Sequence, residues 1–376
     1  MNGISFSEPS TVPPARRRHR FFPLVVSGIR ELTAEAVEVS FTIPPELAEQ
    51  FEYIPGQHVA LKATVDGQDI RRSYSLCAVP NGRELKIGVK ETYGGLFSTF
   101  VRSTLKPGDT LEVMNPQGSF TSSATPDSSG RVVALVAGSG ITPVMALAES
   151  VLQTSAHSRF TLVYANRTAA EVMFLEEIAD LKDRFPARFD VHHVLSREGR
   201  DAELYSGRID APKLEKLLHY IVRPESVDEW FLCGPLELVE LSRKTLDAAG
   251  VDRARVHFEL FSTGDSPARS TPRPVSEKAA SGPQRHVTFR LDGRSATVDT
   301  PAEDPETILT AALRKRADVP FACAGGVCGT CKAVLVKGTV DMADNFALEP
   351  DELKAGYVLT CQSTPTSDDV EVDYDR

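Results

Sequence analysis

Long hydrophobic runs, disulfide-forming cysteines and oxygen-activating metal motifs are scarce or missing in this chain of 376 residues. One uncharged stretch, residues 132–148, carries Gly, Ser, Thr and Pro at its centre, which predicts a strand, a turn and a helix rather than a membrane span. Six cysteines and no apolar signal segment indicate a cytoplasmic protein without a disulfide framework. No E-x-x-H pair and no Rieske Cys/His pairing occurs, so any oxygen chemistry is expected on a partner.

Four of the cysteines stand near the C-terminus in a spacing typical of an iron–sulfur site. Cys323, Cys328 and Cys331 form C-x4-C-x2-C, and Cys361 follows after 29 intervening residues. Three thiolates on one tight loop can reach a cluster from one side while the fourth closes the site, which is the plant-type [2Fe–2S] pattern. Zinc sites usually consist of two separated C-x2-C pairs, so a zinc-stabilised binding protein is the weaker alternative. The spacing therefore predicts a carrier of single electrons.

The chain length and the changing periodicity predict several domains, in a multidomain α+β and α/β fold. Residues 1–20 end in a basic run and are expected to be a disordered tail with no nucleic-acid or membrane role. Short β-rich runs separated by Pro and Gly over residues 21–124 predict an antiparallel β-barrel.

The rest of the chain has a different pattern. Apolar strands alternate with helical segments over residues 125–261, two of them at 144–152 and 171–185, which predicts a doubly wound parallel-sheet nucleotide domain. Residues 262–285 are rich in Ser, Pro and charge and are typical of a linker. Residues 286–376 hold the four cluster cysteines, and their strands, with one helix near 307–317, predict a compact β-grasp ferredoxin domain.

Two short motifs in the barrel region fit the chemical needs of a flavin. Arg72, Tyr74 and Ser75 lie on one expected strand and can pair with a phosphate, stack on the isoalloxazine and hydrogen-bond near its N5. The second motif opens the following helix, whose N-terminus can accept a pyrophosphate. Its candidate residues are Gly94, Gly95, Phe97 and Ser98. A buried tyrosine beside a surface arginine is the alternative interpretation of the first motif.

A glycine-rich turn between a strand and a helix predicts a site for nucleotide phosphates. Its candidate residues are Gly138, Gly140, Thr142 and Pro143, with the proline where the third glycine of G-x-G-x-x-G would stand. Cys233, Gly234 and Pro235 follow a later strand at the ligand-binding edge of the same sheet, so the thiol is expected against the nicotinamide. A small buried cysteine is the alternative there, and is the interpretation preferred for Cys77.

The choice between NADPH and NADH depends on the group that meets the ribose 2′ position. Arg167 follows the second strand of the nucleotide region, and Ser196 and Arg197 follow the third. Neither strand is followed immediately by an acid, although Glu198 is close. Cations that can make bidentate contacts to a phosphate favour NADPH, with NADH and two ordinary surface arginines as the alternatives.

These motifs, in this order, resemble the ferredoxin–NADP⁺ reductase superfamily. The segments that carry the resemblance are R-S-Y-S, G-G-L-F-S, G-S-G-I-T-P, C-G-P and H-F-E-L-F. The C-terminal ferredoxin makes the chain similar to oxygenase reductases. Segments such as L-E-V-M-N-P-Q-G-S-F at 111–120 are similar to the phenylacetyl-CoA epoxidase reductase subunits. The resemblance covers about residues 21–376.

The resemblance implies FAD, a [2Fe–2S] cluster and a nicotinamide dinucleotide, with Ser75, Cys233 and Glu259 at the hydride-transfer site and Phe261 near the flavin. It also implies an oxygenase partner, with di-iron epoxidase subunits first and a Rieske-type aromatic-ring or steroid hydroxylase as the alternative. An electron-carrying module without nucleotide turnover is a further class. Ala324 stands where many related ferredoxin domains carry Arg or Lys, which would alter the cluster potential or partner docking.

Overall fold

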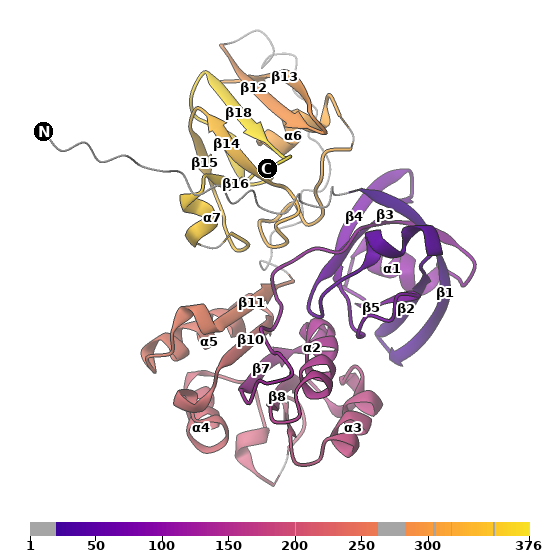
Figure 1. Cartoon of the computed structure of the whole chain (residues 1–376), viewed down its shortest axis with the longest axis vertical. Coiled ribbons are helices and arrows are strands. Elements are labelled where there is room, and N and C mark those ends of the chain that lie inside the picture. The colour runs from indigo at the N-terminus through magenta and orange to yellow at the C-terminus, as the bar shows by residue number, and fades with distance from the viewer. Residues whose placement is uncertain (1–19, 200, 262–282, 304–305, 317, 349) are drawn as a thin grey trace, which may run out of the picture.

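The protein forms three bodies, which Figure 1 shows in colour order along the chain. The computed structural model describes residues 20–199, 201–261, 283–303, 306–316, 318–348 and 350–376. The expected basic tail up to residue 19, and most of the expected linker, 262–282, lie outside the described residues. Within the described ranges, no helix combines the length and the apolar character that crossing a bilayer would require.

The N-terminal body is an antiparallel sheet of six strands in the described residues, in the order β4-β3-β6-β1-β2-β5. Its elements are β1 (Phe21–Thr33), β2 (Ala36–Thr42), β3 (His58–Val65), β4 (Gln68–Ser75), β5 (Glu84–Lys90), α1 (Leu96–Ser103) and β6 (Thr110–Met114). Alternate residues such as Val37, Val39 and Phe41 fill the interior, as the period of a strand requires. A bridge from Leu76 to Ile87 joins the two outer strands, so the sheet curls into the predicted barrel.

The second body is a parallel sheet of five strands in the order β11-β10-β7-β8-β9. The strands are β7 (Arg131–Ala137), β8 (Arg159–Asn166), β9 (Phe189–Leu195), β10 (Glu229–Gly234) and β11 (Val256–Leu260). One apolar layer holds α2 (Ile141–Thr154) and α3 (Leu175–Arg184), and the opposite layer holds α4 (Ala211–Leu217) and α5 (Leu236–Ala248). The doubly wound prediction is therefore confirmed, and residues 132–148 form the expected strand, turn and helix.

The helix expected over residues 171–185 begins later than the pattern indicated. Residues Ala169–Glu171 form a 3₁₀ turn, and Phe174 adopts the left-handed conformation with φ 58°, so α3 starts at Leu175. The buried ring of Phe174 explains why this conformation is kept, since it packs into the core under the sheet. Tertiary packing overrides local helix preference at this position.

The C-terminal body is a mixed sheet of five strands in the order β13-β12-β18-β14-β16, with a short pair β15-β17 beside it. Its elements are β12 (Gln284–Leu291), β13 (Arg294–Pro301), α6 (Ile308–Leu313), β14 (Lys332–Lys337), β15 (Val340–Met342), α7 (Pro350–Lys354), β16 (Tyr357–Leu359), β17 (Ser363–Pro365) and β18 (Asp369–Asp373). Helix α6 packs its apolar face on this sheet. The β-grasp prediction is confirmed, although the helix is shorter than expected.

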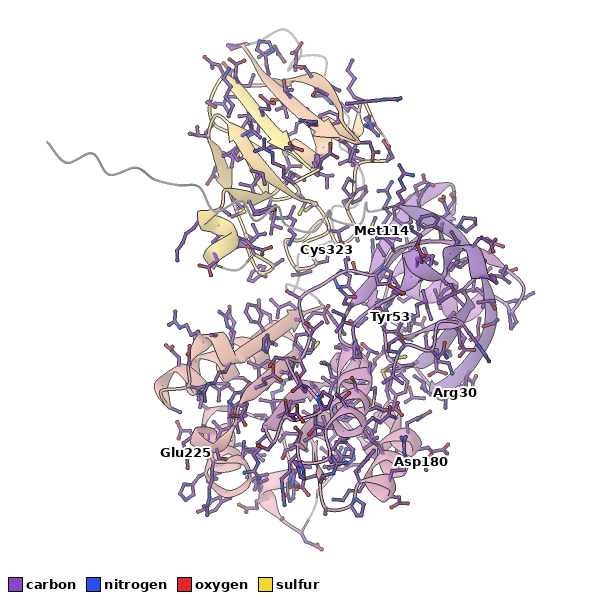
Figure 2. All side chains as sticks on the ribbon, in the orientation of Figure 1. Arg30, Tyr53, Met114, Asp180, Glu225 and Cys323 are labelled. Carbon is purple, nitrogen blue, oxygen red and sulfur yellow. The ribbon has the colours of Figure 1, made fainter. Side chains whose placement is uncertain are left out.

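Apolar contacts join the three bodies. Ala36, Cys77 and Phe120 of the barrel belong to the same core as α2 and α3 of the nucleotide domain. A smaller cluster joins Ala60 and Met114 of the barrel to the cysteine-bearing loop, and Figure 2 shows Met114 beside Cys323 at this junction. The barrel therefore contacts both of its neighbours.

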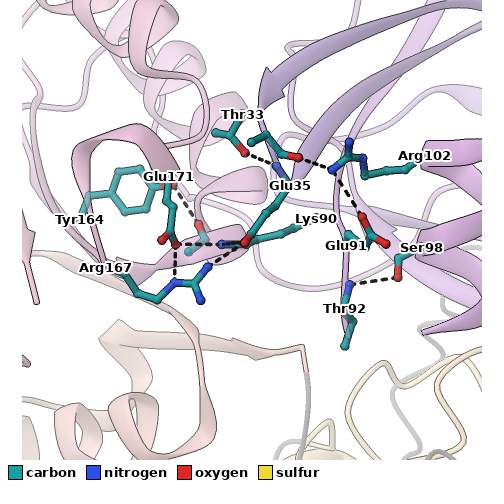
Figure 3. Close-up of polar contacts among 12 residues, drawn as sticks. Thr33, Glu35, Lys90, Glu91, Thr92, Ser98, Arg102, Tyr164, Arg167 and Glu171 are labelled. Carbon is teal, nitrogen blue, oxygen red and sulfur yellow. Dashed lines mark hydrogen bonds and ion pairs between the residues drawn. The ribbon is translucent and has the colours of Figure 1, made fainter. Parts of the chain in front are cut away.

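An ionic network also crosses the junction between the barrel and the nucleotide domain (Figure 3). The guanidinium of Arg167 reaches Glu171 at 2.5 Å and Glu35 of the barrel at 2.8 Å. Lys90 lies 3.6 Å from both carboxylates. Half-exposed pairs of this kind contribute about 0–1 kcal/mol each, so they orient the two domains more than they hold them together.

We expect Gly140→Ala to destabilise the nucleotide domain. A Cβ at Gly140 would stand 2.3 Å from the backbone oxygen of Cys233, and backbone atoms cannot yield as a flexible side chain can. Overpacking of this kind costs roughly 3 kcal/mol. Thermal unfolding should show a lower midpoint for this variant, while Gly199→Ala, whose Cβ would meet nothing within 4 Å, should unfold like the parent. Equal midpoints for the two variants would contradict the close approach.

Candidate functional site

A carboxylate from the nucleotide domain meets two side chains of the barrel. Ser75, at the end of β4, donates a hydrogen bond from Oγ to Oε2 of Glu259 at 3.1 Å. His58, at the start of β3, places Nδ1 3.5 Å from Oε1 of the same carboxylate. Two residues predicted from the sequence, Ser75 and Glu259, are thus in contact although 184 positions separate them. His58 was not predicted as a site residue.

His58 is buried, and its charge state depends on Glu259. Burial disfavours the protonated ring, but the hydrogen bond and the negative charge of Glu259 outweigh it and raise the pKa of His58. Its Nε2 atom has no hydrogen-bond partner in the part of the chain that the structure describes. His58 and Ser75 are paired on the adjacent strands β3 and β4, so the imidazole and the hydroxyl both hold the carboxylate from the barrel.

Cys233 lies beside this carboxylate on the neighbouring strand. Cys233 in β10 is the register partner of Glu259 in β11, and its side chain is fully buried. Burial raises the pKa of the Cys233 thiol well above its ordinary value, and the nearby Glu259 carboxylate acts in the same direction. The thiol is consequently neutral at ordinary pH, and it is a small, uncharged, buried group at the strand end. Phe261, two residues after Glu259, is 38% exposed.

The candidate flavin residues lie at one edge of the barrel. Tyr74 packs its ring against Phe97, with centroids 5.8 Å apart, and Phe97 itself is buried in the barrel core. Arg72 donates to the backbone oxygen of Arg71 at 2.8 Å and is half-buried. Since Phe97 is a core residue, its side chain supports Tyr74 rather than facing a ligand. A tyrosine ring held in this way can stack on a planar cofactor.

The glycine-rich loop before α1 has the free backbone that a phosphate needs. Gly94 has φ 70°, and a Cβ there would meet nothing within 4 Å, so the loop faces open space. Gly95 is the N-cap of α1, and no side chain caps the helix at that position. Ser98 is engaged locally, since its hydroxyl accepts from Thr92 N and donates to Gly95 O. The loop and the open helix end fit a pyrophosphate.

The second glycine turn connects β7 to α2 and has a similar open backbone. Gly138 has φ 54° and open space where a Cβ would lie, whereas Gly140 sits against Cys233 and Gly234. The hydroxyl of Tyr164 donates to Gly138 O at 2.9 Å, and Thr142 donates to Ser139 O at 3.0 Å. These hydrogen bonds therefore fix the turn, and the backbone of Gly138 stays accessible, as a dinucleotide phosphate requires.

The other residues of these two nucleotide motifs lie around the turn. Pro143 is buried in the first turn of α2 and Pro235 is exposed just before α5. Thr142 is also buried, and its methyl group lies where a Cβ at Gly88 of the barrel would stand. The side chain of Thr142 thus packs the junction of the two domains, whereas the backbone of Gly138 faces open space.

The two arginines considered for the ribose have different surroundings. Arg167 is held by Glu35 and Glu171 in the ionic network of Figure 3. Ser196 and Arg197 are exposed at the end of β9, and the Arg197 guanidinium makes no ion pair within the described ranges. A phosphate near this edge would meet an available cation at Arg197, whereas it would have to compete with two carboxylates at Arg167.

The four cluster cysteines gather in two pairs. The side chains of Cys323 and Cys328 are in hydrogen-bond contact, and so are those of Cys331 and Cys361. All four are free of disulfides. Among the described residues, no group of three or more Asp, Glu, His or Cys side chains is placed to hold one metal ion. Two thiolates for each of two iron atoms is the arrangement that a [2Fe–2S] cluster requires, so the residues fit this group.

Several residues at this junction were missed by the sequence reasoning. Arg71 is buried, donates to Val319 O at 3.1 Å and lies over the ring of Phe321 at 4.3 Å. Gln117 donates to the Thr330 hydroxyl at 2.7 Å. The alternation of β4 could have separated Arg71 from Arg72, because successive strand residues point to opposite faces. The position of Thr330 between Cys328 and Cys331 places it in the cluster loop, but no sequence signal marked Gln117 as its partner.

Comparisons with known proteins agree with the three bodies. An oxidoreductase FAD-binding domain family matches residues 23–122, and an oxidoreductase NAD-binding domain family matches residues 135–244. A 2Fe-2S iron-sulfur cluster binding domain family matches residues 289–366. The FAD, nicotinamide and cluster functions inferred from the motifs therefore have independent support.

Similar proteins extend along nearly the whole chain. A subunit of the 1,2-phenylacetyl-CoA epoxidase of Escherichia coli (strain K12) is 42% identical over 355 residues, which cover 94% of this chain and 98% of that protein. The ferredoxin reductase component of the 3-ketosteroid-9-alpha-monooxygenase of Rhodococcus rhodochrous is 35% identical over 356 residues, covering 93% and 96%. The solved structure of phthalate dioxygenase reductase shares the fold, with a TM-score of 0.54 at 22% identity over 94% of this chain and 98% of that one.

We expect Ser75→Ala to slow the reduction of bound flavin by a nicotinamide dinucleotide about fivefold, because one hydrogen bond to Glu259 is worth roughly 1 kcal/mol. Stopped-flow absorbance of the flavin band measures this rate. Ser73→Ala is the matched control, since Ser73 lies on the same strand and its buried hydroxyl has no partner in the described part of the chain. Equal rates for the two variants would remove Ser75 from the reaction.

Proposed function

Because the chain belongs to the family of ferredoxin–NADP⁺ reductase-like flavoproteins that carry a C-terminal [2Fe–2S] ferredoxin domain, we propose that it is the NADPH-dependent reductase of a di-iron phenylacetyl-CoA epoxidase. The observation that carries this proposal is the 42% identity to a phenylacetyl-CoA epoxidase subunit along 98% of that subunit's length. The chain itself is an oxidoreductase that delivers electrons to an oxygenase. We place this reaction in the cytoplasm, where the six free thiols would stay reduced.

The domain order follows from the chemistry of the cofactors. When bound, FAD converts the hydride chemistry of a nicotinamide into single electrons, which iron–sulfur centres carry. The barrel lies against both the nucleotide domain and the cysteine loop, so a flavin on the barrel has both neighbours within reach. We propose that residues 21–124, 125–261 and 286–376 are the three functional units, joined by the linker 262–285.

The roles of individual residues follow from their contacts. Ser75 and Glu259 would form a hydrogen-bonded pair that can accept a proton beside the flavin edge. The neutral, buried thiol of Cys233 would exclude water from the nicotinamide. Tyr74 would stack on the flavin because Phe97 supports its ring. The open backbones of the two glycine loops would receive the pyrophosphates of FAD and of the nicotinamide dinucleotide.

NADPH is preferred to NADH in this proposal because of the charge at the end of β9. Arg197 is exposed, has no ion-pair partner in the described residues and stands next to the hydroxyl of Ser196. A guanidinium and a hydroxyl suit a 2′-phosphate. Glu198 is engaged elsewhere, since its carboxylate accepts from Ala169 N at 2.8 Å, and so it is not free to bind a ribose hydroxyl.

We expect Arg197→Ala to raise the KM for NADPH about 30-fold, which corresponds to roughly 2 kcal/mol for a lost charge-assisted contact to phosphate. The KM for NADH should stay unchanged, because NADH has no 2′-phosphate. Steady-state reduction of ferricyanide with each nucleotide measures both constants. The exposed Arg253, which pairs with Asp247 on another part of the domain, gives the control variant Arg253→Ala. An equal loss with NADPH and NADH would contradict the assignment.

A second oxygenase class has a specific observation in its favour. The 3-ketosteroid-9-alpha-monooxygenase reductase component from Rhodococcus rhodochrous is 35% identical over 93% of this chain. A reductase for a Rieske-type steroid or aromatic-ring hydroxylase would use the same three domains. The higher identity to the epoxidase protein decides our preference, and only the acceptor differs between the two proposals.

Reconstitution with purified oxygenases tests the choice of acceptor. We expect NADPH consumption and epoxide formation when the chain is mixed with di-iron phenylacetyl-CoA epoxidase subunits and phenylacetyl-CoA, both measured by chromatography. The variant Cys361→Ser is the control, since it should still reduce flavin but lose the cluster needed for transfer. Product formation with a Rieske-type steroid hydroxylase instead of the epoxidase would move the function to the second class.

A further inference from the structure

One barrel residue reaches the iron–sulfur loop with its side chain. Gln117 follows β6, and its backbone is fixed by two hydrogen bonds with His58, from His58 N to Gln117 O at 2.8 Å and from Gln117 N to His58 O at 2.9 Å. Its side-chain Nε2 donates to Oγ1 of Thr330 at 2.7 Å, across the junction between the barrel and the ferredoxin domain. The barrel therefore fixes the position of the amide, and a residue of the ferredoxin domain accepts its hydrogen bond.

Thr330 continues this contact to a cluster cysteine. Its side chain is 1% exposed and stands between the ligands Cys328 and Cys331 in the sequence. Its Oγ1 lies 3.1 Å from the sulfur of Cys328. An iron-bound cysteine is a thiolate and can only accept, so the hydroxyl hydrogen of Thr330 must be the donor in this pair. The amide of Gln117, which can only donate through Nε2, occupies an oxygen lone pair and leaves that hydrogen free for the sulfur.

We propose that Gln117 is a positioning residue for the [2Fe–2S] cluster, and that it acts through Thr330 by directing the threonine hydroxyl hydrogen to the Cys328 sulfur. Hydrogen bonds to cluster sulfurs stabilise the more negative, reduced cluster and so raise its reduction potential. The relay joins two domains, so it exists only while the ferredoxin domain is docked on the barrel.

Neighbouring contacts keep the two halves of the relay in register. Ala60 and Met114 of the barrel pack with Ala322 and Cys328 in one small apolar cluster. Arg71 adds a hydrogen bond to Val319 O and a stacking contact with Phe321. These contacts exclude water from the junction, and a hydrogen bond in such a dry, low-dielectric site is stronger than one in water.

The experiment is a redox titration of the full-length protein with flavin and cluster bound, followed by the EPR signal of the reduced cluster. In Gln117→Met and in Thr330→Val we expect the ratio of reduced to oxidised cluster, measured at the parent's midpoint potential, to fall about fivefold, as the loss of one hydrogen bond implies. The double variant should fall no further than Thr330→Val, since both changes break one relay. Thr330→Ser keeps the hydroxyl and should titrate like the parent.

Gln57→Met is the matched control, because Gln57 lies on the same edge of the barrel and donates to Gly118 O without reaching the ferredoxin domain. If Gln117→Met titrates like Gln57→Met, or if the effects of Gln117→Met and Thr330→Val add, the relay is wrong. All variants are compared at equal iron and flavin content. Should Gln117→Met fail to assemble, Gln117→Asn makes the same test, since its amide is one methylene too short to reach Thr330.

Discussion

The contact between the half-buried carboxylate of Glu259 and the barrel is the interaction on which the arrangement of the first two domains depends. A charge removed from water is costly unless partners satisfy it, and here both partners, Ser75 and His58, come from the other domain. The last strand of the parallel sheet is thereby tied to the edge of the barrel. Cys233 stands on the adjacent strand, so the same contact lies beside its buried thiol at the junction of the two domains.

A single strand of the barrel then serves both electron-transfer neighbours. Strand β4 ends at Ser75, which contacts the nucleotide domain, and contains Arg71, which contacts the ferredoxin domain. Its neighbour in the sheet, β3, also contacts both domains, because His58 reaches Glu259 while Ala60 packs beside the cysteine loop. Two adjacent antiparallel strands therefore carry contacts to both neighbouring domains.

The sequence predicted the three folds, because strand alternation, strand–helix alternation and the cysteine spacing are local signals. It also predicted that Ser75 and Glu259 belong to one site, although only through resemblance to a family. Arg167 shows the limit of such reasoning: its position after a strand suggested a phosphate contact, but the packing of the barrel supplies Glu35 as a partner. The contact between Gln117 and Thr330 could not be predicted, because it spans 213 positions and involves common polar residues with no fixed spacing.

The two junctions of the barrel differ in strength, and the difference suits their tasks. Ala36, Cys77 and Phe120 enter the main core of the nucleotide domain, so separating these two bodies would expose a continuous apolar layer. In the described residues, the ferredoxin domain contributes Ala322 and Cys328 to a small apolar cluster with the barrel, and its partly buried Val327 and Phe346 pack against the nucleotide domain. A few directed hydrogen bonds support this attachment. Hydride transfer needs a fixed geometry, whereas a one-electron carrier must also meet an external acceptor. A weaker but directional attachment of the ferredoxin domain satisfies both requirements.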